Sequence, residues 1–160
     1  MHGNVQNEDA LASYWGNRVA TPDWTSPPLG PSEEALTILV VEDEALIRVA
    51  LVDYLEDNGF EVVEAGDAAS AIQLLLYGDI TIDAVFTDIC MPGEMDGLGL
   101  AAWIRQNRAG LPTIVTSGAR RIEAGAEGGL CFFAKPYDCA EVTDRLQEMI
   151  AERRQRASAN

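Results

Sequence analysis

The sequence has few of the residues on which common catalytic and metal sites depend. It contains one histidine, His2, and three cysteines, Cys90, Cys131 and Cys139. A single histidine near the N-terminus leaves almost no material for a zinc site or a histidine-based catalytic triad. An odd number of cysteines without a CxxC spacing is a poor disulfide framework, so we expect reduced thiols in a cytoplasmic protein.

Positive charge and long apolar runs are also scarce. The 11 lysines and arginines are outnumbered by 26 aspartates and glutamates, which gives a formal net charge of −15. Because nucleic-acid phosphates would repel so acidic a surface, direct binding to nucleic acid is not expected. No apolar stretch is long enough to cross a bilayer, and the N-terminus lacks a basic start followed by an apolar run. The sequence therefore predicts neither membrane insertion nor a secretory signal.

The chain has room for one compact domain, because 160 residues with 48% hydrophobic content can bury one core but not two ordinary ones. Residues 1–35 are polar, contain four prolines and show no helical or strand period, which is typical of a flexible extension. Its aromatic residues, Tyr14, Trp15 and Trp24, leave open a contact with the domain or with a partner. We expect an extension over 1–35, a domain over 36–155 and a tail over 156–160.

From residue 36 onward, short apolar runs alternate with segments of helical spacing. The run at 36–41 is continuous and rich in β-branched residues, as expected of a strand buried on both faces. The same reasoning predicts further strands at 60–65, 82–88, 112–116 and 130–134, and helices at 45–57, 68–77, 97–106 and 138–154. Asp67 is the expected N-cap of the second helix. This alternation indicates an α/β domain with a doubly wound, five-stranded parallel sheet.

Ligands of such sheets bind beyond the carboxyl ends of the strands. At these ends the sequence places carboxylates, hydroxyls, a glycine and a lysine: Glu42, Asp43 and Glu44, then Asp88, then Thr116, Ser117 and Gly118, and last Lys135 before Pro136. Clustered carboxylates are tolerated when a divalent cation neutralises them, and Mg²⁺ prefers such oxygen ligands. An aspartate can attack phosphorus and form an acyl phosphate, whose charge a metal, an ammonium group and a hydroxyl could share.

Five groups of residues stand at the predicted strand ends in a fixed order. They are VVEDE at 40–44, VFTD at 85–88, MP at 91–92 with DG at 96–97, PTIVTSG at 112–118, and KP at 135–136. Together they resemble the response-regulator receiver family of two-component systems. The resemblance covers roughly residues 36–152 and implies the flavodoxin-like receiver fold.

The resemblance also implies a metal site and a phosphorylation site. Asp88 matches the phosphoacceptor of the family. Asp43 matches the acid that ligates Mg²⁺ directly, and Glu42 matches its neighbour, which acts through water. The backbone carbonyl of Cys90 matches the third protein ligand of the metal.

Further residues match the groups that respond to the phosphate. Ser117 matches the switch hydroxyl, and Gly118 matches the small residue that leaves room for the phosphoryl group. Lys135 matches the family's lysine, and Pro136 matches the proline that follows a cis peptide bond. Phe132 aligns with the switch aromatic. Ordinary core packing for Phe132 and a simple turn role for Ser117 remain open alternatives.

The sequence departs from the family pattern in two places. The loop at 91–97 is one residue longer than the common pattern. The stretch from Gly118 to Ala134 contains four glycines and few apolar positions, and each glycine costs a helix about 1 kcal/mol relative to alanine. We therefore predict that the helix expected between the fourth and fifth strands is short, frayed or missing, which would remodel the usual output surface.

The expected function is that of a single-domain response regulator. A histidine kinase or histidine phosphotransfer protein would phosphorylate Asp88 with Mg²⁺, and output would pass through protein contacts as a relay shuttle, a phosphate sink or kinase feedback. A homodimer is also possible. The alternative is a receiver-like adaptor that works without phosphorylation. Two enzyme classes fit less well: an aspartyl-phosphate phosphatase needs an acid where Cys90 stands, and the acids at 42–44 would repel a flavin phosphate.

Overall fold

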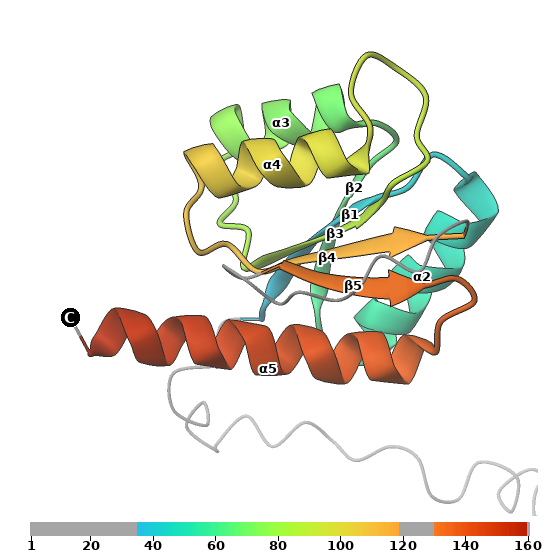
Figure 1. The fold of residues 1–160 in the computed structure, drawn as a ribbon. Helices are drawn as coiled ribbons and strands as arrows, with labels where there is room; N and C mark the ends of the chain where they lie inside the picture. Colours follow the sequence, from blue (N-terminus) through green and yellow to red (C-terminus); the bar gives the residue numbers. More distant parts are fainter. Residues whose placement is uncertain (1–34, 119–129, 160) are drawn as a thin grey trace, which may run out of the picture. The chain divides into compact units, whose positions relative to one another are not determined.

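The computed structural model describes residues 35–118 and 130–159. The chain divides into two units, Met1–Glu34 and Ala35–Asn160, and all described residues belong to the second. They form five strands and four helices in the order β1 (Thr37–Val41), α2 (Ala45–Asp57), β2 (Glu61–Ala65), α3 (Ala68–Tyr77), β3 (Ala84–Asp88), α4 (Gly97–Asn107), β4 (Thr113–Ser117), β5 (Leu130–Ala134) and α5 (Cys139–Ser158) (Figure 1).

The five strands form one parallel sheet in the order β2-β1-β3-β4-β5, which confirms the predicted flavodoxin-like α/β fold. β1, β3 and β4 are buried along their whole length, as their continuous apolar and β-branched sequences predict. In the register of the sheet, Val41 lies beside Thr87, and Asp88 lies beside Thr116. The residues that follow β1 therefore lie at the same sheet edge as the last residues of β3 and β4.

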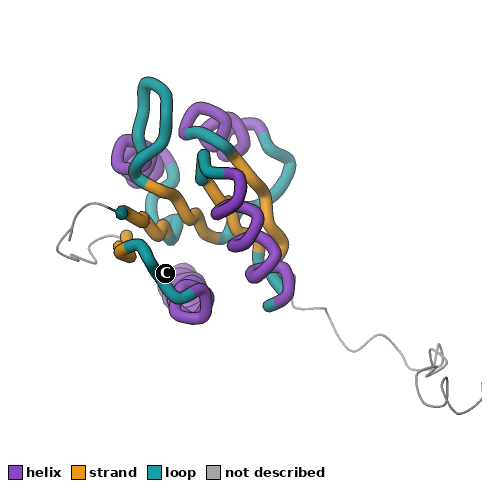
Figure 2. Tube along the Cα trace, turned by 90° about the vertical axis from the view of Figure 1, so that its right-hand side faces the viewer, coloured by secondary structure: helices purple, strands orange, loops and turns teal. Residues whose placement is uncertain are grey.

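Helices cover both faces of the sheet (Figures 1 and 2). On one face, α2 and α5 pack on a cluster that includes Ile38, Val40 and Phe86. On the other face, α3 and α4 pack on a cluster that includes Leu39 and Val41. Alternate residues of β1 thus enter opposite cores, because successive side chains of a strand point to opposite faces. This two-sided burial fixes the register of β1 and with it the position of the residues that follow.

Three of the four helices begin at an aspartate cap. The side chains of Asp67, Asp96 and Asp138 accept hydrogen bonds of 2.7–2.8 Å from backbone N–H groups in the first turns of α3, α4 and α5. Such caps satisfy donors that have no partner within the helix, and the cap predicted at Asp67 is confirmed. Glu44, which precedes α2, makes no side-chain cap bond.

The observed elements agree with the expected ones to within two residues, except at the end of α5. This helix continues to Ser158, four residues beyond the expected end, and an ion pair of 3.2 Å between Glu152 and Arg156 at i,i+4 spacing supports its last turns. None of the helices in the described part of the chain is long and apolar enough to cross a membrane.

Two expectations concern residues outside the described ranges. The extension falls almost wholly on 1–34, and most of the stretch in which we expect a shortened helix falls on 119–129. Both expectations stay predictions.

The position of Leu146 in the core allows a stability test. This α5 residue is fully buried between the helix layer and the sheet, whereas the α2 residue Leu46 is 82% exposed. We expect Leu146→Ala to lower the free energy of unfolding by about 2–5 kcal/mol, because it removes buried methyl groups and leaves a cavity. Leu46→Ala should change it by less than about 0.5 kcal/mol. Urea unfolding of both variants measures the difference, and equal effects would contradict the assignment of α5 to the core.

Candidate functional site

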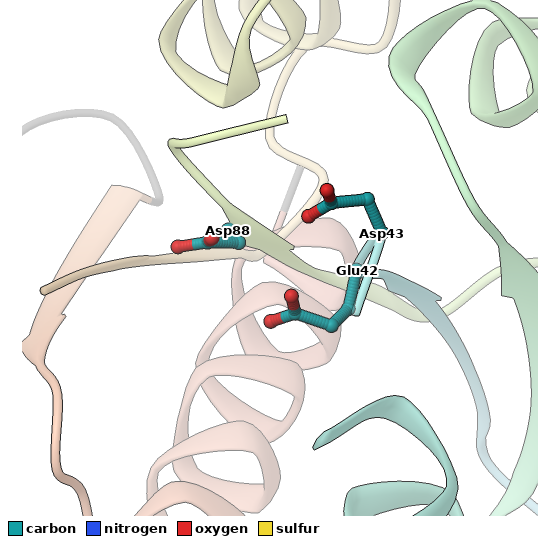
Figure 3. Close-up of side chains that lie close together, drawn as sticks. All are labelled: Glu42, Asp43 and Asp88. Atoms are coloured by element: carbon teal, nitrogen blue, oxygen red, sulfur yellow. The ribbon is translucent and has the colours of Figure 1, made fainter. Parts of the chain in front are cut away.

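Three carboxylates meet where β1 and β3 end. Glu42 and Asp43 follow β1 directly, and Asp88 is the last residue of β3, its neighbour in the sheet. Each of the three offers a carboxylate oxygen, and these oxygens all lie within 4.8 Å of one another (Figure 3). The parallel pairing of β1 with β3 thus joins acids that stand more than 40 residues apart in the chain, as the sequence predicted.

The three acids differ in burial. Glu42 is 1% exposed and Asp88 is 5% exposed, whereas Asp43 lies open to solvent. A buried carboxylate that lacks a partner costs several kcal/mol, so the two buried acids need a nearby cation or strong hydrogen bonds. The exposed Asp43 has no such need, because water can solvate its charge.

Lys135 is the cation that the buried acids share. Its Nζ lies 2.9 Å from Oε2 of Glu42 and 3.2 Å from Oδ2 of Asp88. Burial lowers the pKa of Lys135, but the hydrogen bonds and charges of the two acids outweigh this effect and hold the pKa above its ordinary value. The side chain therefore stays protonated and bridges the ends of two strands.

The turn after β5 brings Lys135 to the site. Its backbone N–H donates a 2.9 Å hydrogen bond to the carbonyl of Ser117, the last residue of β4. The peptide bond between Lys135 and Pro136 is cis, as the resemblance implied. The N–H hydrogen bond ties the start of the turn to β4, and the lysine side chain reaches Glu42 and Asp88 at the ends of β1 and β3.

The backbone and side chain of Asp88 are closely held. Oγ1 of Thr116 lies 3.4 Å from Oδ1 of Asp88, and Oγ1 of Thr87 donates a 3.1 Å hydrogen bond to the carbonyl of Asp88. Gly97, the first residue of α4, packs against the same backbone. A Cβ atom at Gly97 would come 1.9 Å from the Asp88 carbonyl oxygen and 2.7 Å from its carbon. Only glycine allows α4 to start this close to Asp88.

The other predicted site residues surround this centre. Ser117 is buried at the end of β4, and Gly118 follows it in an exposed position. A Cβ atom at Gly118 would meet no atom of the described residues within 4 Å. Cys90 lies exposed in the loop that follows β3. Its role as a carbonyl ligand remains a prediction.

Phe132 is half-buried in β5, where it pairs with Val115 of β4. Its neighbours Cys131 and Phe133 pack against the core on the α2 and α5 face. Because side chains alternate along a strand, Phe132 points to the opposite face. A switching role and ordinary packing both fit this position.

The arrangement suits a divalent cation and a phosphoryl group. Glu42, Asp43 and Asp88 offer hard oxygen ligands, which Mg²⁺ prefers, and their clustered negative charge favours a cation over an anion. Asp88 can act as an oxygen nucleophile, and Lys135 supplies a fixed positive charge beside it. The donor set thus fits the metal and the chemistry that the sequence predicted.

Two residues near the site had no assigned role in the sequence reasoning. Tyr137 follows the cis proline, and its ring packs edge-on against Phe86 of β3 with a centroid distance of 5.5 Å. Arg48 of α2 contacts the backbone of Glu42. Tyr137 lies close to Lys135 in the sequence, and Arg48 lies close to Glu42. This closeness is the one sequence signal that could have pointed to them. Their contacts themselves depend on how α2 and the turn between β5 and α5 pack.

The burial of Tyr137 generates a pH prediction. Burial raises the pKa of Tyr137 to about 12 from about 10, and the pKa of Lys135 is also raised. The folded protein therefore holds these protons more tightly than the unfolded chain, and its stability should fall as the pH rises from about 10 to 12. Tyr137→Phe should make this fall less steep, because it removes the tyrosine's share.

Urea unfolding at several pH values tests this prediction. Tyr77→Phe is the matched control, because Tyr77 is 81% exposed and the variant should keep the wild-type pH dependence. A parallel decline for wild type and Tyr137→Phe would show that burial does not perturb Tyr137.

Known proteins resemble this chain over the described domain. The chemotaxis protein CheY of Bacillus subtilis is 35% identical over 118 residues, which is 71% of this chain and 96% of that protein. The sensor kinase CckA of Brucella abortus is 32% identical over 120 residues, 71% of this chain, yet the chain spans only 12% of it. The chain thus spans a small part of some of its curated relatives.

A solved structure agrees with these relatives. The response regulator receiver protein of Sinorhizobium medicae WSM419 superposes with a TM-score of 0.65 and is 30% identical, over 75% of this chain and 98% of that chain. The family model of the response regulator receiver domain matches residues 38–147, which include all three clustered acids and Lys135. With the sheet order, the acids and the lysine in place, this chain belongs to the response regulator receiver domain family.

Proposed function

We propose that Asp88 accepts a phosphoryl group from a phosphohistidine and that the domain signals by this modification. The observation that carries the proposal is the bridge from Lys135 to the buried Glu42 and Asp88, beside the exposed Asp43. A purely structural ion pair would not need a third acid within 4.8 Å. Membership of the receiver family supports the same chemistry.

The proposed reaction is a direct phosphoryl transfer. A carboxylate oxygen of Asp88 attacks the phosphorus of the phosphohistidine. A P–O bond forms as the P–N bond breaks, and the imidazole nitrogen leaves with the electron pair of that bond. Because Thr87, Thr116 and Gly97 hold Asp88 in place, the oxygen is presented without large movement.

In this proposal, Asp43, Asp88 and the backbone carbonyl of Cys90 hold Mg²⁺, with Glu42 acting through water. The bound ion would neutralise the clustered acids and the charge of the transferred group. The ammonium group of Lys135 lies 3.2 Å from Asp88 and would stabilise the same charge.

The new phosphoryl group would then act on the end of β4 and on β5. Ser117 is the hydroxyl proposed to turn toward a phosphoryl oxygen, and the missing side chain of Gly118 is proposed to leave room for this group. Phe132 in β5 is proposed to follow Ser117. The change would reach the protein surface near these strands, where partners or a second copy of the chain could read it.

The proposed phosphate donor is a sensor histidine kinase or a histidine phosphotransfer protein. Since such donors draw on cytoplasmic ATP, the proposal includes a cytoplasmic location. Output passes through protein contacts of the domain, as a relay shuttle, a phosphate sink or feedback on a kinase. A net charge of −15 gives the protein no attraction to nucleic acid.

The central test is the mass of the intact protein after incubation with acetyl phosphate. Wild type should gain one phosphoryl group only when Mg²⁺ is present, because the ion is needed to neutralise the site. Asp88→Asn should gain none, because the amide cannot attack phosphorus. Asp53→Asn, an exposed aspartate on α2, is the matched control and should react like wild type. A folded wild-type protein that never gains the mass would instead favour a phosphorylation-independent adaptor.

The surface next to the site yields a second test. α2 begins directly after the acids, and its residues Leu46 and Val49 are 82% and 51% exposed. We propose that the phosphate donor packs on these apolar side chains. Leu46→Ser should slow transfer from a phosphohistidine donor by about tenfold, since losing an apolar anchor costs more than about 1 kcal/mol of binding. Reaction with acetyl phosphate should not change.

Tyr77→Ser is the control for this surface, because Tyr77 is equally exposed but lies on α3. It should leave both reactions at the wild-type rate. Equal rates of transfer to Leu46→Ser and wild type would remove α2 from the docking surface.

A further inference from the structure

We propose that Arg48 is a positioning residue for the acids after β1, and that Mg²⁺ binding depends on it. This inference rests on the proposed metal site. Arg48 lies in the first turns of α2, and its guanidinium makes two contacts in different directions. Nη1 donates a 2.5 Å hydrogen bond to the backbone carbonyl of Glu42, and Nε donates a 3.0 Å hydrogen bond to Oε2 of Glu64 on β2.

The hydrogen bond from Arg48 occupies the last free hydrogen-bonding group of Glu42, its backbone carbonyl. The N–H of Glu42 donates to the carbonyl of Ala65 at 3.2 Å, and its Oε2 lies 2.9 Å from Nζ of Lys135. Its Oε1 accepts a 3.3 Å hydrogen bond from the N–H of Glu44. With Arg48 on the carbonyl, every hydrogen-bonding group of Glu42 is engaged. The peptide between Glu42 and Asp43 therefore has little freedom to rotate.

The fixed peptide between Glu42 and Asp43 matters most for the direction of the Asp43 carboxylate. Asp43 is exposed, whereas the residue before it is buried, so the direction of its carboxylate depends on the backbone that carries it. The carbonyl held by Arg48 belongs to the same peptide group as the N–H of Asp43. If that peptide rotates, the carboxylate swings away from Asp88, and the two acids no longer share one cation. Groups that orient metal ligands in this way commonly change metal affinity by 10- to 100-fold.

The guanidinium is better suited to this task than an ammonium group. Its planar fork presents several N–H donors at fixed angles, so one side chain can reach the Glu42 carbonyl and Glu64 together. Glu64 anchors the fork to the neighbouring strand and offsets its positive charge. The α2 helix, which lacks a side-chain cap bond from Glu44, is tied to the end of β1 through the same residue.

The direction in which the Mg²⁺ affinity changes on removal of Arg48 separates a positioning role from a simple charge effect. Arg48 is a cation near a cation site, so by Coulomb's law alone its removal would strengthen Mg²⁺ binding. Loss of positioning would weaken it. A weaker site in the variant therefore cannot come from the lost charge.

The test is a Mg²⁺ titration of the full chain, followed by the NMR shifts of the amides near Asp43 and Asp88. We expect Arg48→Gln to raise the Kd for Mg²⁺ about tenfold. Arg145→Gln is the matched control: Arg145 on α5 is similarly exposed, at 28% against 21% for the Arg48 side chain, and also pairs with a glutamate. It should keep the wild-type Kd. Urea unfolding of each variant verifies that it is folded at the titration temperature.

Arg48→Lys is the second variant, and it is decisive if the glutamine variant does not fold. It keeps the charge and the helix propensity but loses the fork, so it should also bind Mg²⁺ more weakly than wild type. Wild-type or tighter binding in a folded Arg48 variant would overturn the proposal, and so would an equal loss in Arg145→Gln. A wild-type protein that binds no Mg²⁺ would instead overturn the metal site itself, and the inference with it.

Discussion

Much of this structure depends on one ammonium group placed between two buried carboxylates. Lys135 lies 2.9 Å from Glu42 and 3.2 Å from Asp88, and the acids come from the ends of two neighbouring strands. A bridge of this kind is a weak source of stability, because the loss of hydration offsets much of the attraction between the charges. What it provides is a defined geometry: two acids and a cation are held together where like charges alone would separate.

The parallel sheet makes that geometry possible. Each strand of a parallel sheet enters from the same side, so every carboxyl end lies at one edge. β1 and β3 occupy the middle of the order β2-β1-β3-β4-β5, with both faces covered by helices. Their buried side chains fix the register, and the register fixes the acids. Packing in the two cores thus controls the chemistry at the edge without contacting a ligand.

The site also depends on the residues that pack around the acids and the strands that carry them. Gly97 lets α4 begin against the backbone of Asp88, and the ring of Tyr137 packs edge-on against Phe86. Arg48 donates a hydrogen bond to the backbone carbonyl of Glu42. Gly97 and Arg48 thus attach α4 and α2 to the backbone at the ends of β3 and β1, which is the part of the site that must not move when a charged ligand arrives.

The sequence by itself determined the elements of the fold and the chemical types at the strand ends. Continuous β-branched runs, helical apolar spacing and an aspartate cap depend on neighbours along the chain, so residues such as Val40, Leu51 and Asp67 could be assigned from it. The end of α5 was set too early, because its last turns rest on a side-chain pair rather than on an apolar pattern. Which atoms meet was decided only by the tertiary structure. The bridge from Lys135 spans 93 residues to Glu42. The fork of Arg48 joins Glu42, which follows β1, to Glu64 of β2, and Gly97 lies against the carbonyl of Asp88. Each contact exists only once the layers have packed.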